Sequence, residues 1–245
     1  MKKRIYLLLL SVVAIFSACK DNSDDFVEQL FTDAQISSAL KQCADSVAMK
    51  TCNTLCIVDT TGQEKLGYYY YESKSYRIEL PNDMKQIADT LKEYGFQNKV
   101  DSLIFIINRA AEQCGNRITQ FWKPVINDIT FPKPNSILHG GNSAITDFLK
   151  ANKQSEFVAA LVSSILSEQF TALNVDAAWS QLQAKYVEIT GSYSPTPLGI
   201  ITPTAQQMVA GFFKKMALEE AEIRTNKTLQ GNPNGLLYKV FSTLK

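Results

Sequence analysis

Histidine is nearly absent from this sequence, with one residue among 245. A metal site built from several histidines is therefore excluded. An excess of basic charge is also missing, because 25 lysines and arginines stand against 24 aspartates and glutamates, whereas nucleic-acid binding leaves a strongly basic footprint. Eleven glycines and eight prolines are too few for a collagen-like or low-complexity chain. We expect an ordinary globular protein with no nucleic-acid partner, no metal and no cofactor.

A hydrophobic run long enough to span a membrane is lacking as well. The apolar stretch at residues 5–16 has twelve residues, is interrupted only by Ser11, and follows three basic residues at positions 2–4. A spanning helix needs about 20 residues, whereas this pattern is typical of the hydrophobic region of a signal peptide. We therefore expect residues 1–18 to be a signal peptide rather than part of the fold.

The segment Phe16-Ser17-Ala18-Cys19 resembles the lipobox of bacterial lipoproteins, with Phe16 where leucine is most frequent. That resemblance implies that the Cys19 thiol receives a diacylglycerol, that the signal is cut before it, and that the new amino group is acylated. Buried acyl chains contribute about 0.8 kcal/mol per CH₂, so such an anchor is stable. The alternative is an ordinary secretory signal cut after Ala18, with Cys19 left free.

Residues 19–31 predict an acidic tether between the lipid and the domain. Removing residues 1–18 takes away three basic residues and no acidic one, so the mature chain carries 22 basic and 24 acidic residues, a net charge of −2. An acidic chain near an anionic membrane depends on its lipid for attachment. We expect attachment to the outer membrane of a two-membrane bacterium, and the short acidic tract leaves both the periplasmic and the surface-exposed face open.

The remaining residues, 32–245, predict a single, mainly α-helical domain. Thr32 and Gln35 match a capping box at the start of the first helix, and Gly95 marks a helix end. Apolar residues at helical spacing then continue along the chain. The expected helices cover residues 33–50, 82–94, 98–114, 116–129, 143–151, 153–173, 175–190, 204–228 and 236–244.

The exception is a two-stranded β-ribbon expected near residues 68–79. Four tyrosines at 68–71 and the sequence Tyr-Arg-Ile at 76–78 flank a short polar turn. Side chains alternate between the two faces of a strand, so one tyrosine pair is expected in the core. A carbohydrate-binding platform is the alternative for these tyrosines.

Several short motifs occur in a fixed order along the helical part. They are Arg77–Pro81, Asn108–Glu112, Ile137–Gly141 with Ala144 and Thr146, Gly211–Phe213, Glu219–Glu220 with Ile223 and Arg224, and Leu237–Phe241. Together they resemble the uncharacterised bacterial family called domain of unknown function 4197, over about residues 30–245. The resemblance implies a largely helical, exported protein and transfers no catalytic residue. The chain departs from the family around residues 51–63 and 231–234.

The single histidine lies in the turn His139-Gly140-Gly141-Asn142, before an expected helix. Serine or cysteine catalysis would have to use His139, but no Gly-x-Ser-x-Gly elbow accompanies it. One interpretation is a plain chain reversal with Asn142 as the helix cap. The other is an anion site at the helix N-terminus.

Four cysteines remain after lipidation, namely Cys43, Cys52, Cys56 and Cys114. An even number in an oxidising compartment suggests disulfides, and four cysteines allow three pairings. Cys52-x-x-x-Cys56 is a weak metal motif, because no histidine or second cysteine pair completes a zinc site. We favour a disulfide bridge between these two cysteines. Cys43 and Cys114 occupy apolar positions and fit small buried side chains.

A polar cluster is the best candidate for a site. Asn108, Arg109 and Glu112 follow the most apolar helical stretch, so their charges must be paired in the core. Glu219, Glu220 and Arg224 offer complementary charge on a later helix. We expect Arg109 to meet Glu219 or Glu220, and Glu112 to lie near Arg224. The pairs would form either a buried ionic latch, which we favour, or the floor of a pocket.

Three functions remain open. The first, which we favour, is a lipid-anchored, non-enzymatic helical domain that binds a partner in the cell envelope. The second is a carrier for a small apolar or lipid ligand between helices. The third is an unrecognised hydrolase, which a cleft holding Asn108, Glu112 and Glu220 would support.

Overall fold

The computed structural model describes residues 30–56, 75–192 and 199–244, and in these ranges the protein is mainly α-helical, as predicted. Two short non-α turns join the helices, the π-helical η1 (Leu161–Ile165) and the 3-10 helical η2 (Lys227–Gln230). The α-helices are α2 (Asp33–Leu55), α3 (Asn82–Glu93), α4 (Gln97–Glu112), α5 (Gly115–Asp128), α6 (Pro134–Leu138), α7 (Ala144–Ala160), α8 (Leu166–Ala172), α9 (Val175–Thr190), α10 (Ile201–Thr225) and α11 (Leu236–Phe241).

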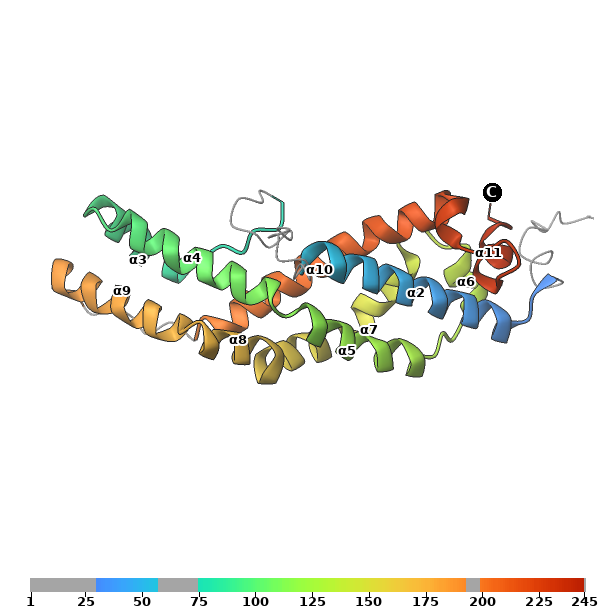
Figure 1. Ribbon diagram of the computed structural model, residues 1–245, viewed down its shortest axis with the longest axis horizontal. Helices are drawn as coiled ribbons and strands as arrows, with labels where there is room; N and C mark the ends of the chain where they lie inside the picture. Colours follow the sequence, from blue (N-terminus) through green and yellow to red (C-terminus); the bar gives the residue numbers. More distant parts are fainter. Residues whose placement is uncertain (1–29, 57–74, 193–198, 245) are drawn as a thin grey trace, which may run out of the picture.

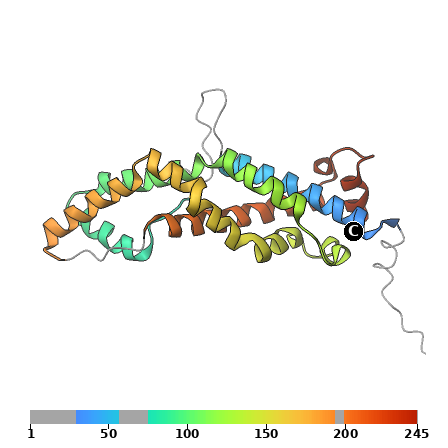
Figure 2. The same ribbon diagram turned by 90° about the horizontal axis from the view of Figure 1, so that it is seen from below.

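The helices form an elongated molecule with two unequal parts (Figures 1 and 2). In the larger part, α2 packs against α5, α10 and α11, and α10 also packs against α7. In the narrower part, α3, α4 and α9 pack against one another. The segment from η1 to α8 contacts α10 and leads into α9, so it connects the two parts.

The first helix begins as the sequence predicts and ends later. The Thr32 hydroxyl accepts a hydrogen bond from the backbone N of Gln35 at 3.3 Å, and the Gln35 side chain accepts one from the backbone N of Thr32 at 2.9 Å. This is the predicted capping box. The helix runs to Leu55 rather than Lys50. Leu55, with Thr51 and Cys52, is buried in this last stretch, so tertiary packing overrides the low helix propensity of threonine and cysteine.

The expected β-ribbon is not confirmed. Its first strand, residues 68–71, lies outside the described residues, and residues 76–78 are not a strand. Side-chain amides bond the backbone at residues 78 and 79. Asn108 on α4 accepts from the backbone N of Ile78 at 2.9 Å and donates to its carbonyl at 3.0 Å. Gln207 on α10 does the same for Glu79, at 3.0 and 2.8 Å. The segment is therefore held between two helices, and side chains satisfy the backbone groups of Ile78 and Glu79.

An aromatic cluster fills the centre of the larger part. Trp122 on α5 stacks on Phe212 of α10, with ring centroids 5.7 Å apart and planes 2° apart. Phe157 on α7 meets Trp122 edge-on at 5.3 Å, and Phe213 meets it at 5.8 Å from the α10 side. All four side chains are almost fully buried. Stacked and edge-on pairs are the arrangements that aromatic rings prefer, so this cluster fixes how α5, α7 and α10 pack.

Within the described part of the chain, no single helix combines the length and apolar composition needed to cross a membrane. The stretches Ala144–Ala172 and Val175–Thr190 meet that test only as a pair, bent by 69°.

Candidate functional site

Glu220 on α10 is completely buried, yet its carboxylate is fully engaged. One oxygen accepts a hydrogen bond from the backbone N of Ile145 at 3.0 Å, and the other accepts from the backbone N and the hydroxyl of Thr146, both at 2.7 Å. Ile145 and Thr146 lie in the first turn of α7. The N–H groups of a first turn have no partner within the helix and form the positive end of its dipole. Glu220 therefore caps α7 from another helix.

Arg224 lies one turn further along α10 and is also buried. Its Nε donates to Oε1 of Glu220 at 2.8 Å. Its Nη1 and Nη2 donate to the carbonyls of Leu138 at 2.8 Å and Ile137 at 3.1 Å, at the end of α6. The guanidinium also lies 5.4 Å from the centre of the Phe241 ring on α11, which allows a cation–π contact. Arg224 therefore connects α10 to both α6 and α11.

We call Glu220, Arg224 and Thr146 the helix latch. The latch joins the negative end of α6, the positive end of α7 and the buried face of α10. Each charge faces a helix terminus of opposite polarity, and each also has its ionic partner beside it. A buried ion pair is stable only when its remaining hydrogen-bonding groups are satisfied, and this geometry meets that condition.

The latch corrects the interpretation of the turn before α7. Asn142 is exposed, and the N-cap residue is Ser143, whose hydroxyl donates to the Asp147 side chain at 2.9 Å and caps no backbone N–H. The prediction that Asn142 caps this helix is therefore wrong. An anion does occupy the N-terminus of α7, but it is the carboxylate of Glu220 from the same chain.

The turn itself is packed closely. The His139 Nδ1 lies 3.1 Å from the carbonyl of Asn135. A Cβ on Gly140 would lie 2.6 Å from the Cβ of Ala144 and 3.2 Å from the carbonyl of Ile137. Only glycine fits that position, whereas Gly141 has open space around it. The arrangement agrees with a chain reversal that brings α6 and α7 together at the latch.

The predicted ion pairs between α4 and α10 are wrong. Arg109 pairs with Glu112 on its own helix at 2.9 Å. Glu219 pairs with Lys215 at 2.6 Å and with Lys50 of α2 at 3.8 Å. Residues three or four apart on a helix are already neighbours. Arg109, Glu112 and Glu219 therefore form ion pairs within their own helices or with α2, and Arg224 forms its ion pair with Glu220.

Two cysteines of α2 show how far apart the two groups of charges lie. Glu220 and Arg224 act electrostatically on Cys43, whereas Glu112 acts on Cys56. These cysteines are thirteen positions apart along the same helix and its cap, which corresponds to about 20 Å at 1.5 Å per residue. The residues of the predicted cluster therefore divide into two groups along α2, one with Glu112 and the other with Glu220 and Arg224.

Four described cysteines, at positions 43, 52, 56 and 114, are buried free thiols, so the bridge favoured between Cys52 and Cys56 is not formed in this structure. Burial raises the pKa of Cys43, and the nearby Glu220 carboxylate raises it further. Burial also raises the pKa of Cys114 to about 12. A hydrogen bond from Cys56 lowers the pKa of Cys52 to about 7, against the effect of desolvation.

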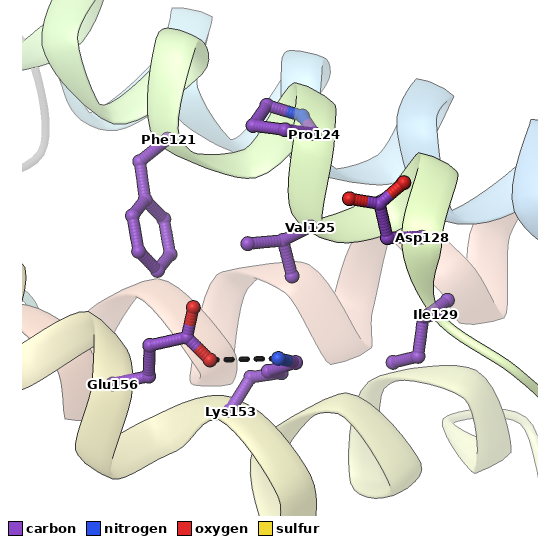
Figure 3. A pocket seen from close by; sticks show the side chains of 7 residues that line it. All are labelled: Phe121, Pro124, Val125, Asp128, Ile129, Lys153 and Glu156. Carbon is purple, nitrogen blue, oxygen red and sulfur yellow. Dashed lines mark hydrogen bonds and ion pairs between the residues drawn. The ribbon is translucent and has the colours of Figure 1, made fainter.

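A pocket of about 300 Å³ opens between α5 and α7 (Figure 3). Phe121 and Val125 point toward it from α5, and Lys153 and Glu156 of α7 form an ion pair of 2.7 Å on the opposite side. Its full lining is Phe121, Pro124, Val125, Asp128, Ile129, Lys153 and Glu156. Ligand pockets of known proteins measure about 300–1,000 Å³, so this one is at the small end and carries three charged residues.

Sequence reasoning missed two polar residues that the structure uses. Thr146 completes the cap on α7, and Gln207 holds the backbone of Glu79. Thr146 stands in one of the motifs of the family resemblance, which was an available signal. Gln207 had none, because glutamine on a helix is ordinarily a solvent-facing residue.

Among the described residues, no group of three or more histidine, cysteine, aspartate or glutamate side chains could hold a metal ion. The family model described as "Protein of unknown function (DUF4197)" matches residues 30–242. No curated protein and no solved structure matches the chain significantly.

Proposed function

The chain belongs to the DUF4197 family of proteins of unknown function, and on that premise we propose that it is a lipid-anchored, non-enzymatic domain of the bacterial cell envelope that binds a partner. Its buried charged residues bond other parts of the fold, and this supports a role in binding better than a role in catalysis.

The observation that carries this proposal is the helix latch. Glu220 and Arg224 belong to the motifs of the family resemblance, and they are the charged residues that a reaction would be expected to use. Their polar atoms instead bond α6 and α7, and Asn108 is bonded to the segment at Ile78. Groups committed in this way stabilise the fold, so the surface of the helical body is left for function.

The location rests on the first nineteen residues. The lipobox-like segment ending at Cys19 supports an acylated anchor, and the acidic residues that follow support a solvated tether. Together they favour the outer membrane of a two-membrane bacterium, with the domain on its periplasmic or exposed face.

A carrier for a small apolar or lipid ligand is the second candidate. The pocket between α5 and α7 favours it, because Phe121, Val125 and Ile129 give it an apolar wall. The ion pair of Lys153 with Glu156 and the nearby Asp128 make the rest of the lining polar. An apolar ligand gains little there, so we rank the carrier below partner binding.

Anchoring is tested by substituting the lipidated residue in full-length protein produced in a two-membrane bacterium. We expect Cys19→Ala to leave the signal uncut or to release the protein from membranes on fractionation. Cys43→Ala is the matched control, since it removes a buried cysteine far from the signal, and it should stay with the membrane. Normal processing and membrane retention of Cys19→Ala would contradict the anchor.

A further inference from the structure

Two cysteines lie one turn apart at the end of α2, next to the start of α5. Cys56 is the C-cap residue of α2, with φ −126° and ψ 43°, and its backbone N still donates to the carbonyl of Cys52 at 2.8 Å. The Cys56 thiol lies beside the Cys52 sulfur and acts on its pKa as a hydrogen-bond donor. The backbone of Cys56 has left helical geometry, and the residue packs closely against Gly115 at the start of α5.

The surroundings of Cys52 differ from those of the other buried thiols. The Thr119 hydroxyl donates to its Sγ at 3.2 Å, and as a thiol Cys52 donates to the carbonyl of Gly115 at 3.0 Å. The two donors, Thr119 and Cys56, stabilise a thiolate, whereas the carbonyl favours the thiol. The balance lowers the pKa of Cys52 to about 7, with the Cys56 hydrogen bond as the main cause.

The Cys52 sulfur is buried next to a residue that is partly exposed to solvent. Cys52 and Cys56 are 3% and 5% exposed, but Thr119 beside Cys52 is only half-buried. The hydrogen bond with Cys52 and burial raise the pKa of Cys56, and the other ionisable groups that face the pair, Cys114 and Glu112, raise it further. Cys52 is therefore the thiol expected to react first, and Cys56 is the thiol expected to react second.

We propose that Cys52 and Cys56 form a reversible dithiol–disulfide couple in which Cys52 reacts first with an external disulfide. The structure is then the reduced form. The proposal goes beyond partner binding and relies on the envelope location only for a supply of disulfides in the cell.

The reaction has two balanced steps. The Cys52 thiolate attacks one sulfur of a disulfide R–S–S–R, and one R–S⁻ leaves and is protonated by solvent. Cys56 then loses its proton to solvent and attacks the Sγ of Cys52, so the second R–S⁻ leaves and is protonated. Two protein thiols are oxidised by two electrons to one disulfide, and the external disulfide is reduced to two thiols.

The bridge is expected to be labile. Cβ atoms four residues apart on a helix are about 5–6 Å apart, whereas a disulfide brings them to about 3.5–4.5 Å. Oxidation must therefore tighten the last turn of α2, and a strained disulfide is more easily reduced than a structural one.

The test uses purified full-length protein in detergent, treated with oxidised glutathione and then alkylated. Both cysteines lie in the tryptic peptide of residues 51–65. We expect this peptide to become unavailable to the alkylating agent and to recover fully with dithiothreitol, while Cys43 and Cys114 stay reduced. Cys56→Ser should trap glutathione on Cys52, and Cys52→Ser should slow the reaction at position 56 at least tenfold.

A second measurement does not depend on variants that must fold. The rate of iodoacetamide labelling of wild-type Cys52 should rise with a midpoint near pH 7, whereas Cys43 in the same sample should stay unlabelled. A bridge from Cys56 to Cys114, thiols at 52 and 56 that remain free in excess glutathione disulfide, or labelling of Cys52 no faster than Cys43 would overturn the proposal.

Discussion

At the scale of single residues, Glu220 shows what a sequence can and cannot predict. The spacing of Glu220 and Arg224 predicts a helical pair, and that pair is present at 2.8 Å. The hydrogen bonds from two backbone N–H groups of α7 to Glu220 could not be inferred. The first N–H groups of a helix need acceptors, but the sequence does not say which residue supplies them. The latch expected between residues 98–114 and 204–228 is wrong, because Arg109 pairs with Glu112 and the buried ion pair of α10 bonds α6 and α7 instead.

Removing either charge of the latch should destabilise the protein strongly. Glu220→Ala leaves Arg224 buried without its counter-charge, and Arg224→Ala does the reverse, so each should lower the free energy of unfolding by about 3–5 kcal/mol. Urea unfolding gives these values, and the double variant should cost less than the sum of the two.

The pair Lys185–Glu188 is the control for the latch, since it also joins a cation and a carboxylate on one helix and its Glu188 is exposed. Glu188→Ala should change the free energy of unfolding by less than about 1 kcal/mol. Latch variants that are no less stable than this control would show that the network does not hold the helices.

The buried thiols Cys43 and Cys114 predict a loss of stability in alkali. Their pKa values are raised above the ordinary 9.0, and that of Cys114 reaches about 12. The unfolded chain therefore releases these protons first. Stability is complete below the unfolded pKa and falls as pH rises toward the folded pKa. Between pH 8 and 10 each thiol should cost about 1.4 kcal/mol.

The check is urea unfolding with a reducing agent at pH 8, 9 and 10. A Cys43→Ala/Cys114→Ala variant should be less stable than wild type at pH 8 but should lose less stability by pH 10. An equal loss in both proteins would assign the alkaline effect to other groups.

At the scale of elements, helices were predictable where apolar spacing and caps agree, as at Thr32 and at Gly95, which takes a left-handed φ of 88° after α3. Ends set by packing were not, and α2 continues to Leu55 for that reason. The segment at Ile78 looked like a strand because its residues suit an extended backbone. Its backbone hydrogen-bond partners include side-chain amides on two helices, and no local sequence pattern predicts such partners.

We therefore expect Asn108 to stabilise the fold rather than to bind a ligand. Its amide makes three buried hydrogen bonds, two to Ile78 and one to the carbonyl of Ile104. Asn108→Ala leaves backbone groups of Ile78 unsatisfied and should cost about 2–4 kcal/mol, since each orphaned group costs about 1–3 kcal/mol. Thermal unfolding monitored by circular dichroism measures the effect.

Asn98→Ala on the same helix is the control, because Asn98 is exposed. It should leave the melting temperature nearly unchanged. A similar melting temperature for both variants would mean that the segment at Ile78 is not held by Asn108.

At the scale of the whole molecule, composition and motif order were enough to predict a helical domain of this family, and the family model confirms the assignment over residues 30–242. The elongated shape was not predictable (Figure 1). It arises because the aromatic cluster and the latch gather α5, α6, α7, α10 and α11 in one part, while α3, α4 and α9 pack separately. Such long-range packing depends on which helix faces meet, and periodicity alone does not specify that.

We propose that this domain is lipid-anchored and acts by binding another protein. Native mass spectrometry of the full-length protein, extracted in mild detergent from the membranes of the cell that makes it, tests both parts at once. We expect a chain that begins at Cys19, has the added mass of acyl groups, and carries a second polypeptide in a fixed ratio. A chain without acyl mass, or an acylated chain that carries only a small apolar molecule, would contradict it.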